Sequence, residues 1–170
     1  MDTKAYIDEI EKLVNGLKGF QVLGVIRMDF KMYFKEIENL LDKLKNEDFD
    51  CVLGVLRGGY VPAEIVSRAF NKPLNLIRLS SYSKDRKQSS IVELGSIGEP
   101  FGKILIVDDL IDSGETLKFL LNKYPGSKTA VIFNKDVKRD LEPDFYSVKV
   151  KNEWIVQPME DYDDYFKSRV

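Results

Sequence analysis

Apolar residues along this chain follow two different repeats. In residues 4–18 and 32–45 they recur every three or four positions, which predicts two amphipathic helices. From residue 51 onward, short continuous apolar runs alternate with segments of helical spacing. Continuous runs are typical of strands buried on both faces, so this part of the chain is predicted to alternate strand and helix.

The predicted elements define a fold class. Strands are expected at 20–26, 51–56, 74–79, 103–107, 129–133 and 145–150, and further helices at 61–70 and 115–123. Residues 80–96 are polar and are expected to form a long loop with a short strand at 91–94. This alternation favours an α/β fold, a mainly parallel twisted sheet flanked by helices. At 170 residues, a single domain is expected.

Three carboxylates and a Ser-Gly-Glu-Thr turn follow the strand expected at 103–107. The acids are Asp108, Asp109 and Asp112, and the turn at 113–116 opens the next helix. Open α/β sheets bind ligands at the carboxyl ends of their strands, and backbone N–H groups at a helix start bind anions. Adjacent carboxylates can each accept a hydrogen bond from one hydroxyl of a vicinal diol. A diol next to a phosphate describes a ribose 5-phosphate, which this segment is predicted to bind.

The segment 108–116 resembles the phosphoribosyl diphosphate (PRPP) signature of the type I phosphoribosyltransferases. The resemblance extends over residues 50–160 and is strongest to the xanthine-guanine members. It implies transfer of the 5-phosphoribosyl group from PRPP to N9 of a 6-oxopurine (guanine, xanthine or hypoxanthine). The products would be the nucleoside 5-monophosphate and pyrophosphate, in purine salvage. The resemblance also implies Mg²⁺ as cofactor, held by Asp108 and Asp109 through substrate or water.

The resemblance assigns roles within the segment. It implies that Asp108 and Asp109 bind the ribose hydroxyls and that Asp112 is the catalytic carboxylate, which manages the proton at N7 of the purine. The implied 5-phosphate cradle is Ser113, Gly114, Glu115 and Thr116. A carboxylate at position 115 is favourable there only if its side chain points away from the phosphate, because like charges repel.

A second group of residues, Arg57 and Gly58, follows the strand expected at 51–56. A leaving pyrophosphate needs a positively charged group with several hydrogen-bond donors, which the arginine guanidinium supplies. It also needs a backbone that can approach it closely, which glycine allows. The resemblance assigns both residues to the pyrophosphate and implies a cis peptide bond between Leu56 and Arg57. Without the resemblance, the same residues are an ordinary turn with a solvated arginine.

A third group is assigned to the purine. The resemblance implies that Lys135 donates to the 6-oxo group, that Trp154 stacks on the ring, and that backbone carbonyls at Ile155 read N1 and N2. A buried lysine donor rejects a 6-amino purine, because two donors would face each other. The chain departs from the xanthine-guanine pattern at Met159, where a tryptophan is expected, and at the base-binding position Glu160, where an aspartate is expected. The preferred 6-oxopurine is therefore left open.

Two further regions take their roles from the resemblance. The loop around Ser81 and Tyr82 is expected to be flexible and to close over the reacting centre, which excludes water that would hydrolyse PRPP. The basic residues of the charged run at 84–87 are suited to the pyrophosphate charge. The single domain is expected to have a core at 46–134 and a small hood, formed by 1–30 and 135–170, that holds the nucleobase.

These motifs also have other interpretations, which imply a different class of protein or a different role for the residues. Residues 103–109 also resemble the first strand of a receiver domain, but a complete receiver needs more chain after that strand than this sequence has. A PRPP-binding regulatory protein on the same fold, a phosphoribosyltransferase for another nucleobase and a weakly active relative are further alternatives. For Lys135 and Trp154 the structural alternatives are a surface lysine and a core tryptophan.

The amino-acid composition limits which residues could act in catalysis or bind a metal, and which partners are expected. The chain has no histidine, so acid–base catalysis falls to carboxylates, lysine, tyrosine or cysteine, and a metal would take oxygen ligands. A net charge of −2 argues against a nucleic-acid or membrane-surface binder. The single cysteine and the absence of a long apolar segment predict a cytoplasmic protein. The expected partners are PRPP and a purine base, and the resemblance implies a homodimer or homotetramer.

Overall fold

The computed structural model describes residues 24–83, 89–151 and 153–160. These residues belong to two compact units. The larger unit is Met28–Asn152, and the smaller one is formed by Met1–Arg27 together with Glu153–Val170. The expected division of one domain into a core and a hood stays a prediction.

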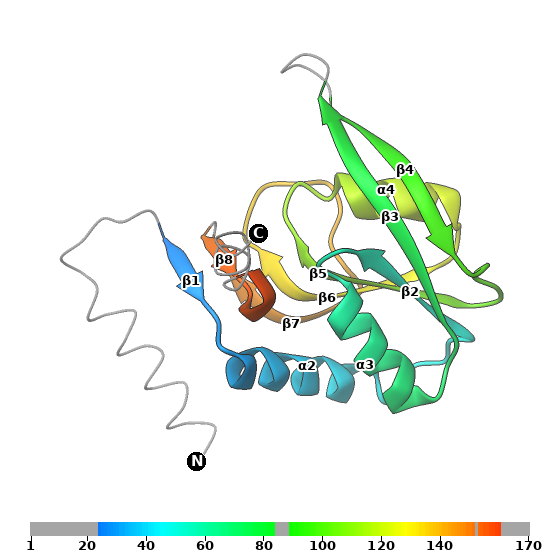
Figure 1. Cartoon of the computed structure of the whole chain (residues 1–170), viewed down its shortest axis with the longest axis horizontal. Coiled ribbons are helices and arrows are strands. Elements are labelled where there is room, and N and C mark those ends of the chain that lie inside the picture. Colours follow the sequence, from blue (N-terminus) through cyan, green and yellow to red (C-terminus); the bar gives the residue numbers. More distant parts are fainter. Residues whose placement is uncertain (1–23, 84–88, 152, 161–170) are drawn as a thin grey trace, which may run out of the picture. The chain divides into compact units, whose positions relative to one another are not determined.

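The larger unit is built on a six-stranded sheet with the strand order β4-β3-β2-β5-β6-β7 (Figure 1). Neighbouring strands are parallel except β3 and β4, which form an antiparallel hairpin at one edge. The predicted α/β class with a mainly parallel sheet is thereby confirmed. The strands are β2 (Cys51–Leu56), β3 (Leu74–Ser83), β4 (Ser89–Ile97), β5 (Ile104–Ile111), β6 (Lys128–Lys135) and β7 (Phe145–Val150).

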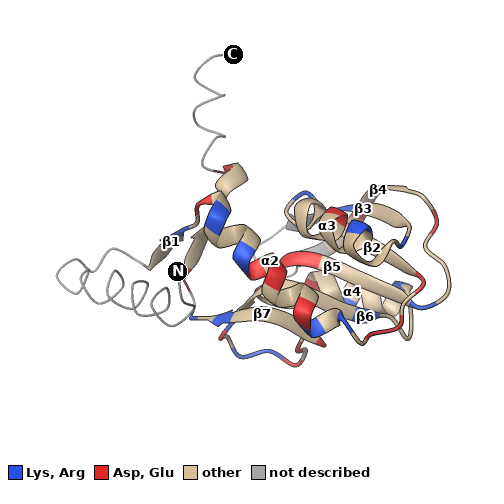
Figure 2. Ribbon diagram, turned by 90° about the horizontal axis from the view of Figure 1, so that it is seen from below, with Lys and Arg blue, Asp and Glu red and all other residues tan. Residues whose placement is uncertain are grey.

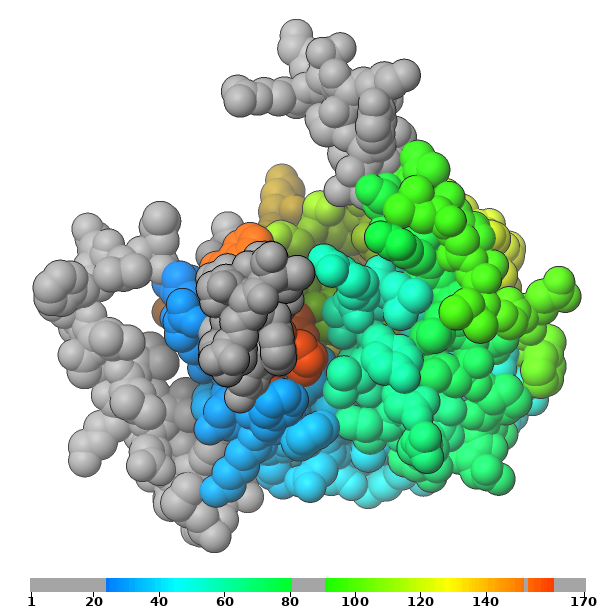
Figure 3. Space-filling model, viewed as in Figure 1, coloured from blue at the N-terminus to red at the C-terminus, as the bar shows by residue number. Residues whose placement is uncertain are grey.

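Helices α2 (Phe30–Leu44), α3 (Tyr60–Phe70) and α4 (Glu115–Lys123) cover the two faces of this sheet. Helix α3 connects β2 to β3 and α4 connects β5 to β6, so the chain leaves the central strand pair in opposite directions. Right-handed crossovers then place α3 and α4 on opposite faces. Helix α2 packs beside α3 and also contacts β6 and β7. The side chains of α2 and α3 form one continuous surface in the space-filling view (Figure 3).

Alternate residues of the central strands face the two helix layers. Leu53 and Val55 of β2 belong to the same buried cluster as Leu117 of α4. Gly54 lies between them and faces α3, where an added Cβ would be 2.6 Å from the Cβ of Ala63. Glycine therefore allows α3 to approach the sheet closely. This approach places the loop between β2 and α3 at the carboxyl end of β2.

Helix boundaries agree closely with the sequence pattern. Helix α4 begins and ends where predicted, at 115–123. Helix α2 begins at Phe30 rather than at residue 32, because the Asp29 carboxylate caps it by accepting a hydrogen bond from the N–H of Met32 at 2.7 Å.

Strand β5 is longer than its apolar run. It continues past residue 107 to Ile111, so that Asp108 and Asp109 are strand residues rather than turn residues. The extension keeps its pairing with β6, where Asp108 lies opposite Val131 and Ile111 lies opposite Asn134. Two carboxylates are consequently held on a rigid strand.

The prediction of a long loop at 80–96 is wrong, although the short strand expected at 91–94 is confirmed, because it lies within β4. Strands β3 and β4 pair as an antiparallel hairpin across most of this stretch, and Ser81 and Tyr82 lie in β3. The apolar alternation of a half-buried strand is weak there because the hairpin forms an edge of the sheet. The charged run at 84–87 lies outside the described residues.

In the smaller unit, β1 (Val25–Arg27) pairs in parallel with β8 (Trp154–Val156). The N–H of Trp154 donates to the carbonyl of Gly24 at 2.7 Å. The strand expected at 20–26 is observed at Val25–Arg27, and β8 was not predicted. The helix expected at 4–18 lies outside the described residues.

Acidic and basic residues are mixed along the described elements (Figure 2). On α2, for example, Lys35 pairs with Glu38 at 3.1 Å on the exposed face of the helix. This mixture is consistent with the small net charge of the chain. Among the helices that the structure describes, none has the length and apolar character needed to cross a bilayer.

Candidate active site

A cleft of about 260 Å³ lies at the carboxyl ends of β2 and β5 in the larger unit. Its walls come from β2 and the loop after it, the hairpin, β5 and the first turn of α4. The lining residues are Val55, Leu56, Arg57, Gly58, Leu79, Ile91, Asp108, Asp109 and Thr116. The structure thus brings together residues that the sequence analysis assigned to pyrophosphate, ribose and 5-phosphate. The apolar hairpin residues Leu79 and Ile91 were not expected there.

The loop after β2 is fitted closely to β5. The peptide bond between Leu56 and Arg57 is cis, as the resemblance implies, and the Arg57 side chain is exposed. At Gly58 an added Cβ would lie 2.2 Å from Oδ2 of Asp109. Glycine at this position leaves the space that the Asp109 carboxylate occupies.

If the cleft binds PRPP as the resemblance implies, Gly58→Ala is expected to raise the KM for PRPP. The added methyl group and the Asp109 carboxylate cannot share the same space, so one of them moves within the cleft. A fall in kcat/KM for PRPP of about tenfold or more is expected, equivalent to about 1.4 kcal/mol. Steady-state kinetics with PRPP as the varied substrate measures the change. An unaltered KM would show that the placement of Asp109 is unimportant for PRPP.

Asp108 is the buried member of the acidic pair, with 8% of the residue exposed. Its Oδ1 accepts a hydrogen bond from the N–H of Asp109 at 2.9 Å. Burial raises the pKa of the Asp108 carboxyl well above its usual range, and the negative charge of Asp109 raises that pKa further. The charged form of Asp108 is therefore costly until a ligand donates hydrogen bonds to it.

We expect Asp108→Asn to stabilise the substrate-free protein and, if Asp108 binds the ribose as the resemblance implies, to weaken PRPP binding. The folded-state pKa of Asp108 lies above its unfolded value. The free-energy cost of ionising Asp108 in the folded protein is therefore absent below pH about 4, where the carboxyl is protonated in both the folded and the unfolded state. This cost develops as the pH rises. One pKa unit corresponds to about 1.4 kcal/mol, or about 3–6 °C in melting temperature for a chain of this size.

Thermal unfolding of wild type and Asp108→Asn at pH 7 and pH 4 measures this effect. The variant should melt at the higher temperature at pH 7, and the difference should shrink at pH 4. A variant that melts below wild type at pH 7 would contradict a burial cost at Asp108.

The turn at 112–116 joins β5 to α4. Gly114 has a positive φ of 82°, which glycine adopts without strain, and it directly precedes the helix. The N-cap residue Gly114 has no side chain to cap the helix, and Oγ of Ser113 accepts from the N–H of Glu115 only at the long distance of 3.5 Å, so the backbone N–H groups here suit an anion. The Glu115 side chain is exposed. A second hollow is lined by Leu110, Ile111, Asp112, Ser113, Gly114, Thr116 and Leu117, and Thr116 therefore lines both hollows.

Lys135, at the end of β6, lies beside Asp112. Its Nζ is 3.0 Å from Oδ2 of Asp112. The Lys135 side chain is 8% exposed and that of Asp112 is 53% exposed, so a nearly buried cation is paired with a carboxylate that solvent can reach. This burial excludes the alternative of a surface lysine. The groups that the resemblance assigns to O6 and N7 of the purine are therefore adjacent.

The other residues assigned to the base lie in the smaller unit. Trp154 is 66% exposed, which excludes the alternative of a core tryptophan, whereas Ile155 is buried. Oε2 of Glu160 accepts a hydrogen bond from the N–H of Gln157 at 3.0 Å. Their assembly with Lys135 into one base site stays a prediction, as does the role of Ser81 and Tyr82 over the reacting centre.

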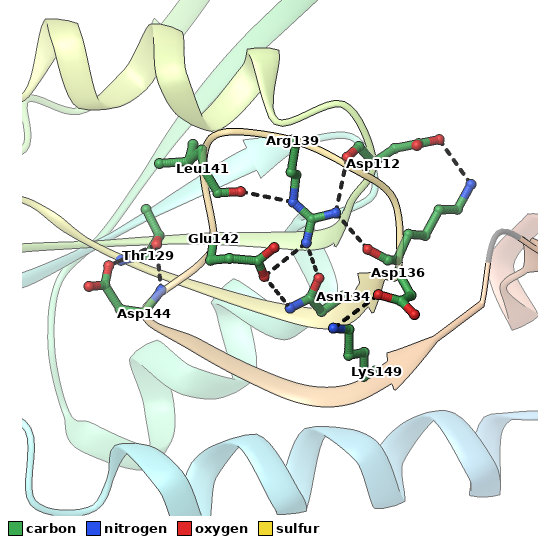
Figure 4. Close-up of polar contacts among 10 residues, drawn as sticks. Asp112, Thr129, Asn134, Asp136, Arg139, Leu141, Glu142, Asp144 and Lys149 are labelled. Atoms are coloured by element: carbon green, nitrogen blue, oxygen red, sulfur yellow. Dashed lines mark hydrogen bonds and ion pairs between the residues drawn. The ribbon is translucent and has the colours of Figure 1, made fainter.

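The sequence analysis missed Arg139, which lies in the loop between β6 and β7. Its side chain is 2% exposed, and its guanidinium donates to the backbone carbonyls of Asp112 and Lys135 (Figure 4). No signal in the sequence distinguishes it, because the loop at 136–144 carries several charged residues without a repeat. A buried arginine in such a loop is recognised only when its neighbours are placed in space.

Comparison with known proteins finds several phosphoribosyltransferases. The model of the phosphoribosyl transferase domain family matches residues 30–164. A xanthine-guanine phosphoribosyltransferase of Idiomarina loihiensis is 32% identical over 122 residues, which cover 68% of this chain and 74% of that protein. The enzyme of the same name from Cereibacter sphaeroides is 34% identical over 117 residues, which cover 66% of this chain and 70% of that protein.

A solved structure is similar over most of its length. The crystal structure of a purine phosphoribosyltransferase from Pyrococcus horikoshii matches with a TM-score of 0.71 and 27% sequence identity. The match covers 80% of this chain and 94% of that one. The similarity therefore extends well beyond the motif at 108–116.

Proposed function

Because the chain belongs to the phosphoribosyl transferase family, we propose that its cleft binds PRPP for transfer of the phosphoribosyl group to N9 of a 6-oxopurine. The protein is a purine phosphoribosyltransferase, an enzyme of purine salvage with PRPP as donor. The observation that carries the proposed site is the meeting of the loop at 57–58 with Asp108 and Asp109 beside the start of α4.

The proposed PRPP site has three parts. The ribose hydroxyls donate to Asp108 and Asp109, and the 5-phosphate accepts from N–H and hydroxyl groups at 113–116. The pyrophosphate lies at Arg57 and the N–H of Gly58. As the bond from C1 to pyrophosphate breaks, negative charge grows on the leaving group and the Arg57 guanidinium stabilises it. No covalent intermediate with the protein is needed, because the chemistry is positioning plus electrostatics.

The purine is proposed to engage Lys135 and Asp112 together. In the free protein these two side chains satisfy each other at 3.0 Å. A 6-oxopurine offers O6 to the ammonium group and the N7 proton to the carboxylate, so each group exchanges its partner for an atom of the base. N9 then attacks C1, and Asp112 takes the N7 proton as positive charge develops on the ring.

Residues of the smaller unit are proposed to complete base recognition. The exposed ring of Trp154 is suited to stacking, which is worth about 1–3 kcal/mol per base. Backbone carbonyls at Ile155 would accept from N1 and N2, and Glu160 lies near them in sequence. The order of preference among guanine, xanthine and hypoxanthine depends on this part of the site.

Mg²⁺ is the usual metal of this family, and the acidic pair suits it. The Asp108 and Asp109 carboxylates line the cleft. Two carboxylates match an ion that takes most of its ligands from substrate oxygens and water. We propose that Asp108 and Asp109 hold the ion in this way. When bound, the ion would neutralise charge on the pyrophosphate.

The experiment that tests the function is a spectrophotometric assay with PRPP, Mg²⁺ and a panel of bases. Guanine, xanthine and hypoxanthine should yield nucleotide, whereas adenine and uracil should not. Turnover of adenine or uracil would overturn the roles of Lys135 and Trp154. Absence of turnover with every base, together with intact PRPP binding, would favour a PRPP-binding regulatory protein.

We also propose that the enzyme is a homodimer or homotetramer. The exposed Tyr60 begins α3 directly after the loop at 57–59, a loop that the resemblance places at a subunit contact. Light scattering coupled to size-exclusion chromatography measures the mass. A monomer at micromolar concentration would contradict this proposal.

A further inference from the structure

We propose that Arg139 is a positioning residue of the transfer reaction: it holds the main chain of Asp112 and Lys135 so that their side chains meet the purine edge together. This inference rests on the proposed function, because it concerns the same base-binding pair. Arg139 itself is not assigned to any substrate. Its role is to fix the distance between two groups, one at the end of β6 and the other in the turn after β5.

The guanidinium reaches both partners of the pair through their carbonyls. One terminal nitrogen, Nη1, donates to the carbonyl of Lys135 at 2.5 Å and to that of Asp112 at 3.3 Å (Figure 4). A single nitrogen therefore joins the end of β6 to the turn after β5. These are the two backbone positions from which the 3.0 Å ion pair between Lys135 and Asp112 extends.

The remaining donors of Arg139 fix the guanidinium itself. Nε donates to the carbonyl of Leu141 at 2.8 Å. Nη2 donates to Oδ1 of Asn134 and, at 3.1 Å, to Oε2 of Glu142. Asn134 in turn donates to the same Glu142 oxygen at 2.9 Å, which closes the network around the buried fork. A planar guanidinium with donors in fixed directions satisfies all of these acceptors, and lysine cannot.

Arg139 also contacts the turn proposed for the 5-phosphate. An added Cβ at Gly114 would lie 3.6 Å from Cδ of Arg139 and 3.6 Å from Cβ of Leu141. The arginine stem therefore packs under the turn while its head holds the carbonyl of Asp112. Because the head binds the backbone of the pair, the side chain of Asn134 on β6 and its own loop, loss of the guanidinium should disturb the base-binding pair more than the acidic pair on β5.

The test compares wild type, Arg139→Lys and the control Arg68→Lys. Arg68 is an arginine on α3 that pairs with Glu64 at 2.5 Å, and its side chain is 79% exposed. The Arg139→Lys variant keeps the positive charge but loses the planar guanidinium group and its set of hydrogen-bond donors. We expect its kcat/KM for the purine to fall by about 10- to 100-fold, as for a displaced catalytic group. Its dissociation constant for PRPP should stay within about threefold of wild type, and the control should match wild type.

A double variant separates positioning from general destabilisation. When Lys135→Met has already removed the positioned side chain, adding Arg139→Lys should cost less than the single Arg139→Lys change does. If Arg139→Lys lowers kcat/KM for the purine by the same factor in the Lys135→Met enzyme as in wild type, the two residues act independently and the inference fails. Equal losses in purine and PRPP affinity would make Arg139 merely structural, and activity within twofold of wild type would also overturn the inference.

Two further outcomes are decided by the same experiment. If Arg139→Lys does not fold, Glu142→Gln is tested in its place, because the Glu142 side chain is 60% exposed. This substitution removes the charged acceptor of the Arg139 guanidinium. It should lower kcat/KM for the purine while the affinity for PRPP is retained. An unchanged Glu142→Gln enzyme would then overturn the inference. A wild-type enzyme that turns over no purine would refute the proposed function and the inference with it, whereas an active wild type with an unaffected Arg139→Lys refutes the inference alone.

Discussion

Asp112→Asn is expected to lower kcat by about 10²- to 10⁴-fold while PRPP binding is retained. The Asp112 carboxylate lies beside Lys135 and remains 53% exposed, so it can reach a base that arrives from solvent. Asparagine keeps the size of the side chain and the backbone carbonyl that Arg139 holds, but it cannot take a proton from N7. The loss should therefore appear in the chemical step.

The chain offers a matched control for this substitution. Asp136 is 65% exposed and also pairs with a lysine, Lys149, at 3.0 Å. Asp136→Asn removes a similar ion pair next to β6 and should leave kcat unchanged, since exposed pairs contribute little. Rapid-quench kinetics and PRPP titration measure the two effects. If Asp112→Asn lost PRPP affinity and kcat by the same factor, Asp112 would be a ligand of the ribose instead.

Lys135→Met is expected to remove the preference for 6-oxopurines. Lys135 is nearly buried, and methionine fills a similar volume without leaving an unpaired charge in the interior. The donor to O6 is lost, so kcat/KM for guanine should fall by about 10²-fold or more. The rejection of adenine weakens at the same time, because no second donor then faces its 6-amino group.

The measurement is the ratio of kcat/KM for guanine and adenine in wild type, Lys135→Met and the control Lys149→Met. Lys149 is a half-exposed lysine on β7 and should be replaceable without effect. An unchanged ratio in Lys135→Met would place base selection elsewhere, for example on Trp154 in the smaller unit. If kcat/KM fell for guanine and adenine were still rejected, Lys135 would contribute to the affinity for guanine and not to the discrimination between the two purines.

The elements with strong apolar periodicity could be predicted from the sequence. Helix α4 appears at its predicted boundaries, and the acids and the turn around it were correctly expected at one edge of the sheet. Carboxylates do not follow the apolar pattern of a buried strand, so the continuation of β5 through Asp108 and Asp109 was not visible. It is held by pairing with β6, which is a property of the assembled sheet.

Other parts depend on contacts that no local pattern shows. The β3–β4 hairpin is at a sheet edge, and its polar residues were interpreted as a loop. Strand β8 is only three residues long and depends on pairing with β1. The pairing of Lys135 with Asp112, and the fork of Arg139 behind it, bring together the ends of separate strands and a loop.

The most direct test of the proposed site is a crystal structure of the enzyme with PRPP and Mg²⁺. The account predicts the ribose hydroxyls at Asp108 and Asp109, the 5-phosphate in the turn at 113–116, and the pyrophosphate at Arg57 and Gly58. PRPP bound away from this cleft, or bound with its two phosphate ends exchanged, would contradict it.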